Sequence, residues 1–88
     1  MKIEFRASFA KDLRKIKEAS VKKQALAVIS AAEQAGDLQE IENLKKLKGG
    51  DGYYRIRVGD YRLGLVFNEN TLVFVRFLHR KDIYRYFP

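Results

Sequence analysis

Four short runs of this 88-residue chain have the apolar content and spacing of β-strands. They cover residues 2–6, 53–58, 61–68 and 71–78. In such a run every second side chain points to the same face, so one face can be buried while the other meets solvent. Between the first run and the second, the apolar spacing becomes helical. The chain therefore combines helices and strands in separate segments.

Two helices are predicted between residues 8 and 36. The first follows Ser8, a plausible N-cap, and places Phe9, Leu13 and Ile16 on one face. The second has Ser20 as its plausible N-cap and Gly36 in the left-handed position that often ends a helix. Its apolar stripe consists of Val21, Ala25, Val28, Ile29 and Ala32. The basic residues of the two helices are interpreted as a solvated face: Lys11, Arg14, Lys15, Lys22 and Lys23.

The remaining segments complete the expected fold. Residues 37–52 are irregular and fit either one helical turn or a packed loop, which the GGDG stretch at 49–52 ends. Residues 79–87 have helical character up to Pro88. The element order is β-α-α-β-β-β with a short C-terminal helix. We therefore predict one α+β domain over residues 1–88, with an antiparallel sheet packed under a helical hairpin.

The second and third strands are expected to form a tight hairpin. Gly59-Asp60 lies between them, and Gly at the first central position suits a two-residue type II′ turn. That turn fixes the register, with the pairs Tyr54–Leu65, Ile56–Leu63, Val58–Tyr61, Arg55–Gly64 and Arg57–Arg62. The first three pairs form an apolar face under the helices. The last two pairs form a basic face.

The basic face is unusual for a sheet built only for stability. Arg57 opposite Arg62 is a like-charge pair, which costs a few tenths to about 1 kcal/mol. Gly64 in mid-strand leaves space beside Arg55 where a side chain would normally pack. We interpret this face as a concave floor left open for an anion. The alternative is that its arginines form ion pairs with Asp or Glu from elsewhere in the chain.

Residues of the last strand and of the C-terminal segment extend this face. If the loop after the third run contains Glu69, Asn70 and Thr71, then Arg76 lies opposite Gly64, while Val73, Val75 and Phe77 turn inward. A two-residue loop would bury Arg76, and an unpaired buried guanidinium is costly. His79, Arg80 and Tyr84 follow directly, so we expect them at the rim of the floor.

Charge and composition narrow the functional classes. The net charge is +7, and residues 45–88 carry ten Lys and Arg against four Asp and Glu. This half is therefore expected to face a polyanion. There is no Cys, and no apolar run of membrane-spanning length. We expect a cytoplasmic protein that uses neither metal nor cofactor and does not bind a membrane.

The basic half contains no residue set for the common hydrolytic mechanisms. No Ser-His-Asp or Cys-His set and no paired carboxylates are visible, and the single His cannot build a metal site. Two functional classes remain. One is metal-independent phosphodiester chemistry on RNA or DNA, and the other is simple binding of a polyanion. Arginines hold phosphate in bidentate fashion and stabilise transition-state charge, and tyrosines such as Tyr53 or Tyr84 can stack on bases. RNA also supplies its own 2′-hydroxyl nucleophile.

Three motifs resemble the RelE/ParE superfamily of toxins from type II toxin–antitoxin pairs. They are LKKLKG at 44–49, YYRIRVGDYRLGLVF at 53–67 and HRKDIYR at 79–85. The resemblance covers nearly the whole chain and implies the family's fold. It implies either a RelE-like enzyme that cleaves mRNA in the ribosomal A site, or a ParE-like inhibitor of DNA gyrase that has no nuclease activity. A member that only binds its antitoxin is a third possibility.

The resemblance also assigns roles to residues. RelE-like catalytic positions fall on Arg55, Arg57, Arg62, Arg80 and Tyr84. Arg62 and Arg80 would stabilise the scissile phosphate, Tyr84 would stack on or orient the nucleotide, and the products would be a 2′,3′-cyclic phosphate and a 5′-hydroxyl. Further RNA contacts are expected from Arg76, His79, Lys45, Lys46 and Lys48. The implied partners are an antitoxin, the ribosome and mRNA.

One departure from the family bears on mechanism. The best-known member has Lys at the two strand positions that hold Arg55 and Arg57 here. Arginine stays protonated at any useful pH and cannot act as a general base. His79 or Tyr84 would then take the proton, or the mechanism would rely on electrostatics and positioning alone.

Overall fold

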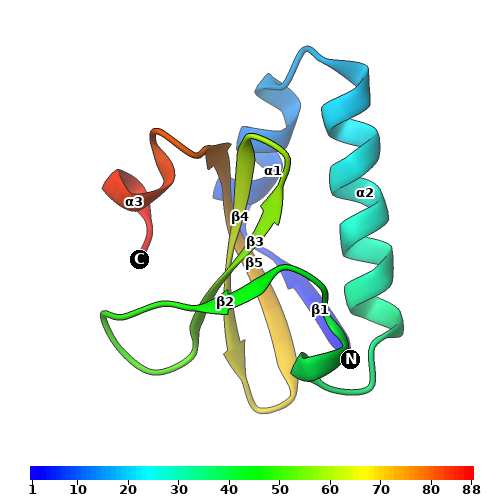
Figure 1. Cartoon of the computed structure of the whole chain (residues 1–88), viewed down its shortest axis with the longest axis vertical. Coiled ribbons are helices and arrows are strands. Elements are labelled where there is room, and N and C mark those ends of the chain that lie inside the picture. The colour runs from blue at the N-terminus through cyan, green and yellow to red at the C-terminus, as the bar shows by residue number, and fades with distance from the viewer.

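The computed structural model describes all of residues 1–88, and its helices and strands are shown in Figure 1. The elements are β1 (Lys2–Phe5), α1 (Ala7–Lys15), α2 (Ala19–Gln34), the 3-10 turn η1 (Leu38–Glu40), β2 (Leu44–Lys46), β3 (Tyr53–Val58), β4 (Tyr61–Asn68), β5 (Thr71–His79) and α3 (Ile83–Tyr86). The α+β class and the predicted element order are confirmed. The bounds of β3 and β4 match the sequence prediction at both ends.

The five strands form one mixed sheet in the order β1-β5-β4-β3-β2. All neighbours are antiparallel except β1, which lies parallel to β5. The expectation of a purely antiparallel sheet is corrected at this edge. The short strand β2 is also new, because its three residues pair with β3 inside the segment that we expected to be a helical turn or a loop. Three residues are too few to show a strand period in the sequence.

The β3–β4 hairpin has the predicted register in full. Val58 pairs with Tyr61, Arg57 with Arg62, and Arg55 with Gly64. Gly59 has φ of 60°, as the first central position of a type II′ turn requires. The turn chemistry and the alternation of side chains therefore place the arginines on the face away from the core.

The β4–β5 connection differs from the prediction. Asn68 pairs with Thr71, so the loop is the two-residue turn Glu69-Asn70, in which both φ angles are positive. A β-bulge between Gly64 and Leu65 then shifts the register. Arg76 therefore lies opposite Gly64 as predicted, but the cause is a two-residue turn followed by a bulge rather than a three-residue loop.

The bulge also changes which residues of β5 face the helices. Leu72 and Phe74 are buried before it and Phe77 after it. The predicted inward positions of Val73 and Val75 are wrong, because both residues are only partly buried and alternate with the buried pair. The prediction for Phe77 is confirmed.

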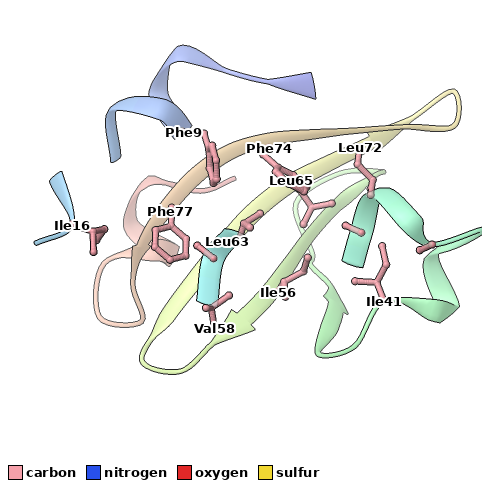
Figure 2. Packing of buried hydrophobic residues seen from close by; sticks show 13 residues of the cluster. Phe9, Ile16, Ile41, Ile56, Val58, Leu63, Leu65, Leu72, Phe74 and Phe77 are labelled. Carbon is pink, nitrogen blue, oxygen red and sulfur yellow. The ribbon is translucent and has the colours of Figure 1, made fainter. Parts of the chain in front are cut away.

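The main core lies between the sheet and the helical hairpin. Its cluster of 13 buried hydrophobic residues is drawn in Figure 2, where Phe9 of α1 points toward the strands beside Phe74 and Phe77. Phe9 contacts the rings of Phe5, Phe74 and Phe77 at centroid distances of 5.7, 5.6 and 6.3 Å. Figure 1 shows α2 on one side of the strands and α3 on the other. One face of the sheet is therefore covered by the hairpin and the opposite face only by the C-terminal segment.

The predicted helix caps are not formed. Arg6 and Glu18 occupy the N-cap positions without side-chain hydrogen bonds, and Gly36 does not have a positive φ. The Ser8 hydroxyl instead donates to the carbonyl of Val75, on the edge of β5 beyond the end of β1. The Ser8 hydroxyl thus forms a tertiary hydrogen bond with β5 in place of the helix cap that the local sequence predicts. None of the helices has the length and hydrophobicity required to cross a bilayer.

Candidate nucleic-acid interface

The arginine face is the surface formed by Arg55, Arg57 and Arg62 on the side of the sheet away from the helical hairpin. Lys45 joins it, because Lys45 pairs with Arg55 across β2 and β3. Lys46 pairs with Tyr54 and therefore belongs to the opposite face, while Lys48 lies in the loop after β2. Of these three predicted lysines, only Lys45 is placed beside the arginines by the strand register.

Asn43 holds two of the arginines. Its carbonyl oxygen accepts from Nη1 of Arg55 at 3.2 Å, and its side-chain Oδ1 accepts from Nη2 of Arg57 at 3.4 Å. The same carbonyl accepts from the Arg57 backbone N–H. Asn43 has φ of 63°, a left-handed conformation that Asn tolerates better than most residues. The turn before β2 thus presents both acceptors to the arginine face.

Arg62 is held by the hairpin turn itself. Its Nη1 donates to the carbonyl oxygens of Gly59 at 2.8 Å and Tyr61 at 2.9 Å. Its other guanidinium nitrogens have no recorded protein partner. The guanidinium is therefore oriented through one nitrogen and keeps donors for a ligand.

Arg55, Arg57 and Arg62 form no ion pairs with the chain's own carboxylates. The two salt bridges of the structure are Lys2–Glu4 and Arg76–Asp12. The alternative that the arginines of this face are neutralised by Asp or Glu is therefore wrong. A basic face without internal counter-charges is suited to an external polyanion.

The C-terminal segment brings two further predicted residues near this face. The Arg80 backbone N–H donates to the carbonyl of Asp60 at 2.8 Å, which ties the segment to the tip of the hairpin. The Arg80 side chain is exposed, and Tyr84 is 59% exposed. The segment therefore leaves β5 beside the Arg57–Arg62 pair and carries Arg80 and Tyr84 in solvent-accessible positions.

The predicted open floor over Gly64 is corrected. A Cβ atom built on Gly64 would lie only 2.6 Å from Cδ2 of Phe87, so the ring fills the space above the glycine. Phe87 is 3% exposed and meets the Tyr53 ring edge to face at 5.8 Å. The gap that we assigned to an anion is occupied by the chain's own C-terminus.

Arg76 joins the edge of β5 to helix α1 through an ion pair with Asp12. Its Nε and Nη2 donate to the two carboxylate oxygens of Asp12 at 2.7 and 3.2 Å, and the Phe77 N–H donates to the same carboxylate at 3.0 Å. The hydrogen bonds to Asp12 raise the pKa of Arg76, although desolvation acts in the opposite direction. The guanidinium also lies 5.5 Å from the ring centroid of Tyr86. Nε and Nη2 of Arg76 are thus paired with a carboxylate inside the protein, and this ion pair is the reason that we exclude Arg76 from the proposed RNA contacts.

His79 lies on the helix-covered side of the sheet. It pairs with Tyr61, which belongs to the apolar face, and the two rings meet at 5.5 Å. A cavity of about 400 Å³ between α1, β5 and the C-terminal segment is lined by both rings together with Asp12 and Arg76. The expectation that His79 joins the arginine rim is therefore wrong, because strand alternation turns it to the opposite face.

Three residues that support the site were missed from the sequence. Asn43 lay in the segment that we left unassigned, and its position before a hydrophobic–basic run gave no specific signal. Asp12 was expected on a helix but not as the buried partner of β5. Phe87 lies in the segment 79–87, for which the sequence predicts only helical character. Its pairing with Gly64 is a contact between distant parts of the chain, and no local pattern marks it.

The comparisons with known proteins cover almost all of the chain. A family model described as the ParE toxin of the type II toxin–antitoxin system parDE matches residues 3–84. Toxin RelE3 from Methanocaldococcus jannaschii is 42% identical over 89 residues, which span 100% of both proteins. The RelB-RelE antitoxin–toxin complex from Methanococcus jannaschii matches with a TM-score of 0.80 and 40% identity, over 97% of this chain and 99% of that chain. The RelE-RelB complex from Pyrococcus horikoshii OT3, at 20% identity, has the same fold, with a TM-score of 0.73 over 93% and 97% of the two chains.

Proposed function

The chain belongs to the RelE/ParE superfamily of type II toxin–antitoxin toxins, and from this premise we propose that it is an mRNA endonuclease acting in the ribosomal A site. The 42% identical relative and the structural matches carry RelE names, which supports the RelE-like branch over gyrase inhibition. The matched solved structures include antitoxin complexes, so an antitoxin is the partner best supported. The ribosome and mRNA are the further partners that we propose.

The observation that carries the proposal is the set of unneutralised arginines on one face. Arg55, Arg57 and Arg62 are each oriented by a carbonyl or amide oxygen, yet none faces a carboxylate. Oriented guanidinium donors suit a phosphodiester, whose oxygens accept in bidentate fashion. The net charge of +7 would be compensated by the ribosomal RNA and the mRNA.

In the proposed reaction the mRNA supplies its own nucleophile. The 2′-oxygen attacks the adjacent phosphorus, its proton passes to water, and the bond from phosphorus to the 5′-oxygen breaks. The departing 5′-oxygen takes a proton from water, which leaves a 2′,3′-cyclic phosphate and a 5′-hydroxyl. Arg62 and Arg80 would stabilise the charge that develops on the phosphoryl oxygens, and Tyr84 would stack on the nucleotide.

This chain gives the reaction a largely electrostatic character. Arg55 and Arg57 stay protonated and cannot accept the 2′-hydroxyl proton. His79 faces the other side of the sheet, beside Tyr61. Since Tyr84 is assigned to stacking on the nucleotide, we propose that positioning and charge stabilisation carry the rate, with solvent as the proton acceptor.

The test is primer extension on a defined mRNA incubated with the purified protein. One reaction contains ribosomes that hold a codon in an empty A site, and the other contains the mRNA alone. Cleavage only with ribosomes, leaving a 2′,3′-cyclic phosphate, is the expected result. Intact mRNA in both reactions would overturn the proposal, and inhibition of DNA gyrase supercoiling would then be the assay to run.

A further inference from the structure

Two buried hydrophobic residues stand apart from the main core. Ile83 is 0% exposed and Phe87 is 3% exposed, yet neither belongs to the 13-residue cluster under the helical hairpin. Both come from the C-terminal segment, which lies on the opposite side of the strands from α2 (Figure 1). The helix α3 that connects them has only four residues. A single turn of helix is unstable alone, so these two buried side chains must hold the segment in place.

Gly64 is shaped to receive Phe87. A Cβ atom at position 64 would lie 2.6, 2.8 and 2.8 Å from three atoms of the Phe87 ring, and contacts this short do not occur in real structures. Gly64 has no positive φ, so nothing in its backbone conformation demands glycine. Glycine in the interior of a strand is otherwise unfavourable. The close approach of the ring is thus the physical reason for glycine at this position.

The segment between its two attachments carries the exposed candidate residues. At one end the Arg80 N–H is bonded to the hairpin tip through the carbonyl of Asp60. At the other end Phe87 lies on Gly64, directly across the strands from Arg55. Arg80 is itself the first attachment point and Tyr84 lies between the two attachments, and both side chains are exposed to solvent. Their place relative to the arginine face therefore depends on both attachments.

We propose that Phe87, seated on Gly64, is a positioning residue that fixes Arg80 and Tyr84 against the arginine face. Phe87 itself touches neither substrate nor phosphate in this scheme. The consequence for catalysis rests on the proposed nuclease function. The seating of the segment does not, and it is measured independently of any activity.

The activity test uses four variants of the full chain in single-turnover cleavage of ribosome-bound mRNA. Phe87→Ala and Gly64→Ala should each slow cleavage about 100-fold, because a displacement near 1 Å at a reacting group costs about that much. Phe87→Leu should stay within about threefold of wild type, since Leu still fills the site. Gly64→Ala combined with Phe87→Leu should recover at least about tenfold over Gly64→Ala, because the smaller side chain makes room for the added Cβ.

A matched control separates positioning from general loss of stability. Ile29→Ala removes a partly buried side chain of α2 that packs against the main core and touches no residue of the arginine face. It should lower the melting temperature while the folded fraction cleaves at the wild-type rate. A rescue by the double variant is also an outcome that destabilisation alone does not produce.

Hydrogen exchange tests the seating directly. The amides of Asp82, Arg85 and Phe87 are bonded to the carbonyls of His79, Asp82 and Ile83. In Phe87→Ala these amides should exchange at least about tenfold faster, whereas the amides of β4 keep their protection. Unchanged exchange in Phe87→Ala would overturn the inference, as would faster exchange with wild-type cleavage. If the wild-type protein cleaves nothing, the proposed function fails and the exchange pattern alone decides whether Phe87 seats the segment.

Discussion

The two faces of the sheet are stabilised by different means. The helix-covered face buries 13 hydrophobic residues in one continuous cluster, in which the Phe9 ring contacts the rings of Phe5, Phe74 and Phe77. The opposite side of the sheet carries the arginine face along β3 and β4, and the buried hydrophobic side chains that the C-terminal segment contributes are Ile83 and Phe87. Stability is thus concentrated on one face, which leaves the other free to keep like charges close together. Each of the following variants tests this division.

Truncation in the helix-covered core should have the largest effect on stability. Phe74 is fully buried and contacts the rings of Phe5 and Phe9 at 5.5 and 5.6 Å. Phe74→Ala removes these contacts and leaves a cavity, so the free energy of unfolding should fall by about 3–5 kcal/mol. Urea denaturation followed by circular dichroism measures the change. A loss below about 1 kcal/mol would show that the main core is not the principal source of stability.

The Asp12 carboxylate joins α1 to the edge of β5, and its removal should have the next largest effect. Asp12→Ala leaves the Phe77 N–H and the Arg76 guanidinium without their acceptor, which should cost about 1–3 kcal/mol of unfolding free energy. Asp12→Asn is the matched control, because its amide oxygen still accepts from Phe77. The melting temperature should therefore be highest for the wild type, lower for Asp12→Asn and lowest for Asp12→Ala. Equal melting temperatures of the two variants would contradict the hydrogen-bond account.

The pH dependence of this pair follows from the raised pKa of Arg76. A cation whose pKa is higher in the folded state contributes stability at every pH below its unfolded pKa and loses it only as the pH rises through the folded value. The contribution of Arg76 should therefore be constant between pH 6 and pH 9, about three units or more below any titration of the guanidinium. Melting temperatures of wild type and Arg76→Met across this range test the prediction, and a difference that shrinks toward pH 9 would contradict it.

Loss of the Asn43 amide should reduce activity with little change in stability. Asn43→Gly keeps the left-handed backbone and the carbonyl that accepts from Arg55, but removes the Oδ1 acceptor of Arg57. Cleavage should slow by about tenfold, the value of one hydrogen bond to a charged group. Single-turnover cleavage and urea denaturation of the same preparation separate the two effects. Wild-type cleavage by Asn43→Gly would show that this contact does not orient Arg57.

The smallest expected effect has the opposite sign. Arg57→Thr removes the like-charge pair with Arg62 and places a residue that favours strands at this position. The free energy of unfolding should rise by a few tenths to about 1 kcal/mol while cleavage falls. A lower unfolding free energy in urea would show that Arg57 stabilises the sheet, contrary to the division between the two faces.

The sequence was most informative where one local feature fixes the geometry. The Gly59-Asp60 turn set the register of β3 and β4, so the faces of Arg55, Arg57 and Arg62 were predicted correctly. The course of β5 was harder to predict, because its two-residue turn places Leu72 and Phe74 on the inner face in place of Val73 and Val75. The bulge at Gly64, which has no sequence signature, then restores the predicted positions of Arg76 and Phe77. His79 was assigned to the wrong face for another reason: it lies two residues after the inward Phe77, so strand alternation already placed it on the inner face.

Contacts between segments far apart in the chain could not be predicted from the sequence. The space over Gly64 was correctly seen as unusual, but its occupant comes from 23 positions later in the chain. Asp12 likewise meets Phe77 and Arg76 only once α1 has docked on the free edge of β5. Such partners depend on the packing of whole elements rather than on local periodicity.

The most direct test of the functional face is a pair of arginine variants in single-turnover cleavage of ribosome-bound mRNA. Arg62→Ala removes an oriented donor of the arginine face, and Arg14→Ala removes an exposed arginine of α1 on the other side of the sheet. Arg62→Ala should cleave about 100- to 1,000-fold more slowly at an unchanged or slightly higher unfolding free energy, while Arg14→Ala cleaves at the wild-type rate. Wild-type cleavage by folded Arg62→Ala would contradict the assignment of the arginine face as the catalytic surface.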